Sequence, residues 1–158
     1  MAGMNGLKKY LKYIFRPFMP KRSAITEDTI ALLVDTFYDR IHGDPVLGPV
    51  FDAKIAPEDW PRHLATMRRF WSSVMLTSGQ YSGNPVGVHR GVAGLERPMF
   101  ARWLSLFEQT AADLFEPEVG ALFAAKAHRI AGSLELAVFH RLGGRPDGLR
   151  LPERRAGC

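Results

Sequence analysis

The segment NPVGVHRG, residues 84–91, interrupts a chain whose remaining pattern is mostly helical. It contains one proline, two glycines and a histidine at position 89. Because proline and glycine break regular structure, the segment predicts a loop with at most a short helix around His89. A histidine in such a segment is ordinarily a surface residue, so its role depends on the helices that surround it.

Four longer segments carry apolar residues at the spacing of three and four that is typical of an amphipathic helix. The first follows a predicted cap at Thr26 and ends at Gly43, and the others begin near residues 57, 97 and 117. Residues 46–51 read as a short connecting segment. No strand pattern and no internal repeat appear, so the sequence predicts an all-α fold with four main helices in one domain.

Composition and charge narrow the classes of protein. The 158 residues are 46% hydrophobic and 23% charged, as in an ordinary globular domain. Of the net charge of +5, residues 1–22 carry +6 and residues 141–158 carry +3, which leaves −4 for the body. A basic face on the folded domain is therefore not expected, and we predict no nucleic-acid partner. The single cysteine, Cys158, allows no disulfide framework, which favours a reducing, cytoplasmic compartment.

The two ends are predicted to lie outside the domain, which we place at residues 23–142. Within the extension 1–22, the run LKKYLKYIFRPF (7–18) predicts a basic amphipathic helix that contacts an anionic membrane surface as a peripheral element. A helix docked on the domain and a frayed extension are the alternatives. No apolar run approaches the roughly 20 residues of a membrane span. Residues 143–158 predict a flexible basic tail.

The residues that could carry chemistry lie among aromatic side chains of the predicted helices. Phosphate loops, paired cysteines and hydrolase motifs are absent from the sequence, so side-chain catalysis has little support. His63 shares a helical face with Met67 and Trp71, and Tyr38 and Trp103 lie on apolar faces of other helices. Each alone fits an ordinary core. Together with His89 they match what a haem site requires, which is an axial imidazole, apolar walls and a few hydrogen-bond donors.

Several separated runs resemble the group III truncated haemoglobins over residues 25–140. They are FYDRIHGDPVLGPVF (37–51), EDWPRHLATMRRFWSSVML (58–76), YSGNPVGVH (81–89) and FARWLSLF (100–107). The resemblance implies a shortened globin fold, a two-over-two helical sandwich with a short proximal helix around one haem b. The double-glycine motifs of other truncated haemoglobins are missing, as is usual in group III. Nothing in the family pattern explains the basic N-terminal segment.

The resemblance also implies roles for individual residues. His89 matches the proximal ligand of the haem iron, and its second ring N–H is expected to bond a nearby backbone carbonyl. Tyr38, Trp103 and His63 match the distal residues, where His63 acts as donor, as gate or as a ligand of ferric iron. Arg62, Arg69 and Arg90 are unranked candidates for the haem propionates. Residues expected to contact the haem are Phe51, Met67, Phe70, Trp71, Val86, Val88 and Phe100.

The function implied is binding of O2 and other diatomic ligands. NO, CO, cyanide and peroxide are further expected ligands. Several donors would slow oxygen release, which argues against simple oxygen delivery, and they could also polarise a bound peroxide. NO dioxygenase or peroxidase-like activity, served by an unidentified reductase, is the enzymatic form of this expectation. One alternative is a haem-based sensor or redox partner recruited to a membrane by residues 7–18. A haem-free helical interaction module is the other.

Overall fold

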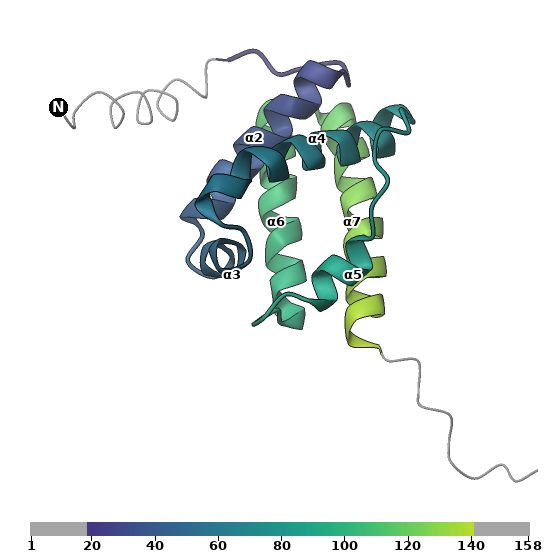
Figure 1. Cartoon of the computed structure of the whole chain (residues 1–158). Coiled ribbons are helices and arrows are strands. Elements are labelled where there is room, and N and C mark those ends of the chain that lie inside the picture. Colours follow the sequence, from purple (N-terminus) through teal and green to yellow (C-terminus); the bar gives the residue numbers. More distant parts are fainter. Residues whose placement is uncertain (1–18, 141–158) are drawn as a thin grey trace, which may run out of the picture.

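The computed structural model describes residues 19–140, and this part of the chain is helical throughout (Figure 1). An isolated bridge between Arg22 and Phe115 is the sole β-type pairing in this range. The predicted all-α class is therefore confirmed, while the predictions for residues 7–18 and 143–158 lie outside the described residues. The elements are α2 (Glu27–Gly43), α3 (Leu47–Lys54), a 3-10 turn (Pro57–Asp59), α4 (Trp60–Leu76), α5 (Pro85–Arg90), α6 (Arg97–Leu114) and α7 (Pro117–Phe139).

The long helices form two layers. Helices α6 and α7 run side by side in opposite directions, and α2 and α4 pack together across their upper part (Figure 1). Helix α3 packs on α2 at one edge, and α5 lies against α7 below α4. The two-over-two arrangement is as expected. None of the helices between residues 19 and 140 is long and apolar enough to span a bilayer.

Local chemistry accounts for the start and end of the helices. Thr26 caps α2, since its Oγ1 accepts from the Thr29 backbone N–H at 3.2 Å while Thr29 Oγ1 accepts from the Thr26 N–H at 2.9 Å. The predicted cap is confirmed. Helix α4 is preceded by the 3-10 turn and ends at Leu76, where Thr77 adopts a left-handed conformation with φ 55°.

Helix α3 corrects the sequence interpretation, because residues 46–51 were expected only to connect two helices. Pro49 is tolerated since it lies in the first turn, where its missing N–H leaves no helical bond unmade. Asp44 Oδ1 accepts from the N–H groups of Val46 at 3.0 Å and Leu47 at 2.8 Å and so satisfies the helix start. Gly48 lets α3 approach α2, because a Cβ there would lie 3.1 Å from the Ile41 carbonyl oxygen.

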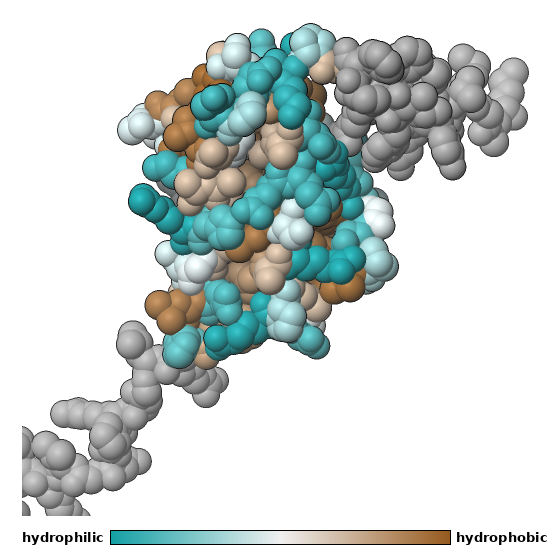
Figure 2. Space-filling model, turned by 180° about the vertical axis from the view of Figure 1, so that it is seen from behind, coloured by the Kyte–Doolittle hydropathy of each residue, from teal (hydrophilic) through white to brown (hydrophobic). Residues whose placement is uncertain are grey.

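The core lies between the two layers and is rich in aromatic side chains. Its largest fully buried members are Phe37, Phe107, Phe115, Phe123, Ile30, Leu33 and Ile41. Burying each such side chain contributes roughly 1.5–3 kcal/mol. On the face shown in Figure 2, hydrophobic residues form separate patches among hydrophilic ones.

Candidate functional site

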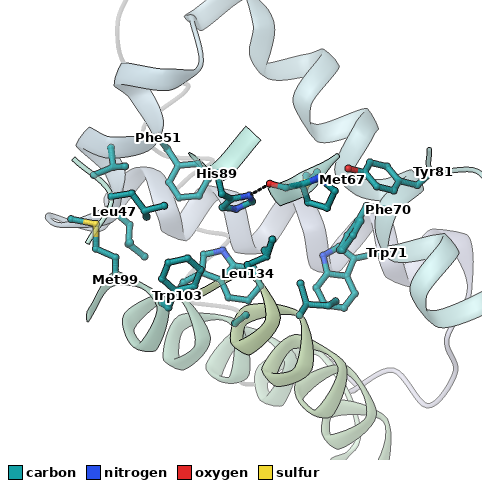
Figure 3. Close-up of a pocket in the computed structure, with 16 residues that line it drawn as sticks. Leu47, Phe51, Met67, Phe70, Trp71, Tyr81, His89, Met99, Trp103 and Leu134 are labelled. Carbon is teal, nitrogen blue, oxygen red and sulfur yellow. Dashed lines mark hydrogen bonds between the residues drawn. The ribbon is translucent and has the colours of Figure 1, made fainter. Parts of the chain in front are cut away.

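An apolar pocket opens beside the core between both helical layers and α5, and it encloses about 810 Å³ when the open solvent at its mouth is included (Figure 3). Its walls come from α3, α4, α5, α6, α7 and two loops. They are formed by Leu47, Val50, Phe51, Met67, Phe70, Trp71, Tyr81, Pro85, His89, Leu95, Met99, Phe100, Trp103, Ile130, Ala131 and Leu134. Such a predominantly apolar cavity with few polar groups is typical of a cofactor or small-molecule site.

His89 reaches this pocket from α5, a helix that its own sequence stabilises. Pro85 occupies the first helical position, and the Asn84 side chain caps the helix by accepting from the Gly87 N–H at 3.0 Å. Gly87 leaves room for that cap, because a Cβ there would lie 2.7 Å from the Asn84 amide nitrogen. The segment that looks like a loop in sequence is therefore a capped helix of six residues.

The orientation of the His89 imidazole is set by a backbone contact. Its Nδ1 lies 2.6 Å from the Pro85 carbonyl oxygen, and since a carbonyl only accepts, Nδ1–H is the donor (Figure 3). The predicted backbone acceptor is confirmed. In the neutral imidazole this tautomer leaves Nε2 with its lone pair, as metal coordination requires.

The structure corrects the expectation for Val86 and Val88, neither of which lines the pocket. The Val88 residue is 56% exposed. Successive side chains of an α-helix point about 100° apart, so one face of a short helix holds residues four apart. In α5 these are Pro85 and His89, and both line the pocket.

Two tryptophans of the pocket wall are fixed by a stack of rings. Phe107, 1% exposed, lies between Trp71 (centroids 4.8 Å apart, planes at 18°) and Trp103 (5.2 Å, 10°). Phe37 meets the Phe107 and Trp103 rings edge-on, each at 5.3 Å. Figure 3 shows both indoles at the pocket wall. Close packing on these faces leaves the two indoles few alternative rotamers.

The predicted distal residues Tyr38 and His63 form a cluster directly beside the pocket and do not line it themselves. Their rings meet perpendicularly at 5.0 Å, and Tyr38 contacts the lining residue Phe51 at 5.9 Å. No described residue hydrogen-bonds to the Tyr38 hydroxyl. His63 Nε2 is buried and also lacks a partner among the described residues. A buried polar atom without a partner, as His63 Nε2 is here, is uncommon and indicates a missing ligand or water.

Burial sets the charge state of this pair. It raises the pKa of the Tyr38 phenol and lowers the pKa of the His63 imidazole. Both shifts favour the neutral form, because desolvation penalises charge. Near neutral pH the cluster therefore offers an O–H group and an uncharged imidazole, both suited to hydrogen bonding.

The predicted pocket residues divide into two groups, since seven line the cavity and four do not. Those that line it are Phe51, Met67, Phe70, Trp71, His89, Phe100 and Trp103. Tyr38 and His63 lie in the adjacent cluster, and the two valines of α5 lie outside. Sequence reasoning missed Tyr81, whose backbone N–H donates to Ser73 Oγ at 2.9 Å and whose ring contacts Phe70. It also missed the α7 wall of Ile130, Ala131 and Leu134.

The three arginines considered as partners of the haem propionates all contact other protein groups. Arg90 donates to the Ala137 carbonyl at 2.7 Å, Arg62 pairs with an aspartate of the 3-10 turn, and Arg69 bonds Thr66. Lys54, which sequence reasoning did not select, donates from Nζ to the Gly91 carbonyl at 3.4 Å. This contact joins the end of α3 to the end of α5, and it places the positively charged Lys54 ammonium group where these helices meet.

These residues fit a haem. The pocket supplies one imidazole with a free Nε2, a broad apolar wall and neutral polar groups at its edge, which are the features of a histidine-ligated haem site. Within residues 19–140 no cluster of three or more His, Cys, Asp or Glu side chains could hold a bare metal ion. His89 would hold the iron of a haem group through Nε2.

Comparison with known proteins gives two matches, while no family model matches the chain. The chain is 29% identical over 126 residues to a Campylobacter jejuni protein described as group 3 truncated hemoglobin ctb. The alignment covers 78% of this chain and 98% of that protein. The crystal structure of a group III truncated hemoglobin from the same species superposes with a TM-score of 0.72 at 29% identity. It covers 80% of this chain and all of that one.

Proposed function

Because this chain belongs to the group III truncated haemoglobins, we propose that its pocket binds one haem b, with His89 as the proximal ligand of the iron. We propose further that O2 and other diatomic ligands bind on the side of Tyr38, His63 and Trp103. The observation that carries the proposal is His89 in the pocket wall, with Nδ1 bonded to the Pro85 carbonyl and Nε2 available.

The proximal side holds the imidazole in one orientation. The bond from Nδ1–H to the Pro85 carbonyl fixes the ring and leaves the Nε2 lone pair free. The Asn84 cap anchors the helix that carries it. Haem, when bound, supplies the iron at which a gas molecule is held, and the protein contributes orientation and an apolar enclosure.

The distal side provides hydrogen bonds to a bound gas. Tyr38 donates from its hydroxyl and Trp103 from its indole N–H, and neither has a hydrogen-bond partner among residues 19–140. In an apolar pocket such donors stabilise partial negative charge strongly, because little solvent competes. Slow release of O2 follows, which suits a protein that reacts with its ligand better than one that delivers oxygen. NO- or peroxide-directed redox chemistry, with electrons from a separate reductase, is our proposal for that reaction.

The test is haem binding by the purified full-length chain. Reconstitution with haem should give a Soret band, and His89→Ala should abolish stable binding because the iron loses its protein ligand. The matched control is His128→Gln, since His128 is an exposed histidine that pairs with Glu108 and does not line the pocket. No Soret band in the wild-type chain would support a haem-free module instead, and a normal spectrum for His89→Ala would refute the ligand assignment.

A cytoplasmic location with peripheral membrane contact is a separate proposal, favoured by the basic and apolar faces of residues 7–18. Liposomes containing anionic lipid should sediment the full chain, and removing residues 1–18 should abolish the effect. Equal sedimentation of both forms would contradict it.

A further inference from the structure

Trp60, the first residue of α4, lies against the distal pair without lining the pocket. Its ring centroid is 5.4 Å from that of His63, with the planes at 84°, and 6.0 Å from that of Tyr38. On its other side His42, from the end of α2, lies at 4.1 Å. The His42 side chain is 41% exposed. The half-buried indole therefore contacts both the exposed His42 and the half-buried His63 ring, whose Nε2 is buried.

The geometry of α4 places Trp60 in the way of an outward rotation of His63. Side chains on an α-helix lean toward its N-terminus, and residues three apart are neighbours on its surface. The imidazole of His63 thus leans over the turn that begins with Trp60. Turning the ring toward solvent by that route carries it across the indole.

Contacts from two other helices keep Trp60 in place. His42 packs on it with the ring planes tilted by 54°, and His42 Nδ1 lies 3.3 Å from Asp52 Oδ1 of α3. The Trp60 indole packs against His42 and Tyr38 of α2, with α3 supporting His42, so it cannot withdraw without breaking these contacts.

The buried state of His63 needs such an opposing contact. Its Nε2 has no hydrogen-bond partner among the described residues, and leaving a buried nitrogen unpaired costs free energy. Water would satisfy that nitrogen if the ring turned outward. The Trp60 ring, in contact with that of His63, is placed to oppose this rotation.

We propose that Trp60 is a positioning residue that keeps His63 turned inward and thereby sets how fast diatomic ligands enter the haem site. The inference rests on the proposed function, since it concerns entry to that site. Trp60 acts through His63, and it touches neither the pocket nor the ligand.

The first measurement is CO association after flash photolysis of the full-length, haem-loaded chain. Trp60→Ala should speed association roughly 2- to 12-fold, which corresponds to the loss of one aromatic contact. Trp60→Phe keeps a ring at this position and should restore most of the wild-type rate. Glu58→Gln is the control, because Glu58 is an exposed neighbour in the preceding 3-10 turn.

A double-mutant cycle separates positioning from general loosening of the helix. With His63→Ala already present, Trp60→Ala should leave CO association unchanged, because no imidazole remains to be held. Equal acceleration in both backgrounds would overturn the inference.

Titration of the His63 ring by NMR in the CO-bound chain gives a readout that does not depend on ligand entry. Burial lowers the pKa of His63, so Trp60→Ala should raise it toward its usual value by opening the ring to water. An unchanged pKa would contradict the proposal.

Two further outcomes keep the test decisive. If Trp60→Ala does not fold, His42→Ala removes the support behind the indole and should accelerate CO association by a smaller factor; an unchanged rate then overturns the inference. A wild-type chain that binds no haem overturns the proposed function itself. A haem-loaded chain whose CO association ignores Trp60 overturns only the positioning role.

Discussion

The Tyr38→Phe substitution should have opposite effects on protein stability and on ligand retention. Tyr38 is 6% exposed, and its hydroxyl has no hydrogen-bond partner among the described residues. Its ring packs edge-on against Phe37 and His63 at 5.1 and 5.0 Å. Phenylalanine preserves these ring contacts and removes only the hydroxyl, so the two effects can be attributed to that single group.

The size of each effect follows from the surroundings of the hydroxyl. Without a ligand, the poorly hydrated O–H lacks a partner, and its removal should raise the free energy of unfolding of the haem-free chain by about 1 kcal/mol. With O2 bound, the same group donates to a partly negative oxygen. A hydrogen bond to a charged group contributes about 1.5–3 kcal/mol, so its loss should speed O2 dissociation roughly 10- to 150-fold.

Two assays measure the two effects on the same full-length protein. Urea unfolding of the haem-free chain gives the stability, and stopped-flow displacement of O2 by CO gives the dissociation rate. Faster dissociation together with unchanged or higher stability supports a donor role for Tyr38. An O2 dissociation rate within twofold of wild type would refute it, and lower stability would show that the hydroxyl has a structural partner.

Two further variants test other parts of the site. Trp103→Phe keeps a ring stacked on Phe107 and removes the indole N–H, so O2 dissociation should rise about tenfold in the same displacement assay; if both this variant and Tyr38→Phe leave the rate unchanged, the assigned donors are wrong. The second variant concerns Asp44, which ties the α2–α3 corner to the helix of Trp103. The Arg102 guanidinium, 2.8 and 2.9 Å from its oxygens, and two backbone N–H groups lower the pKa of Asp44 from 3.8 to about 2. A carboxyl with a lowered folded-state pKa stabilises the fold above its unfolded pKa and loses that stabilisation as pH falls. Unfolding of wild type should therefore become easier by about 1 kcal/mol between about pH 4 and pH 2, an amount reduced for solvent screening because Arg102 is 44% exposed. Asp44→Asn should remove this dependence, and an equal pH slope in both proteins would contradict the assignment.

The pattern of the sequence was sufficient for the long helices. Apolar residues at a spacing of three and four predict α2, α4, α6 and α7, because an amphipathic helix must bury one face wherever it packs. Helix α5 was predicted only as a loop with at most a short helix, although Pro85 and the Asn84 cap that form it act within the segment itself. Helix α3 was missed because its start depends on Asp44 and its position on the close approach of Gly48 to α2.

Only part of the candidate site could be predicted from the sequence. His89 was identified from a resemblance to a family and from its unusual segment, whereas periodicity alone could not distinguish it from a surface histidine. The same limit applies to α7, where Ile130 and Leu134 line the pocket while other apolar residues of that helix fill the core. Periodicity says which face of a helix is buried, and it does not say what that face is buried against.

The sequence by itself determined which segments are helical and which residue types are available for a haem site. Only the tertiary structure decided that Val88 faces solvent, that Phe107 fixes Trp71 and Trp103 between the layers, and that Trp60 contacts His63. The physical reason is that helix formation depends on residues within a few positions of each other. A pocket arises where helices distant in sequence fail to fill the space between them, and that gap has no local signature.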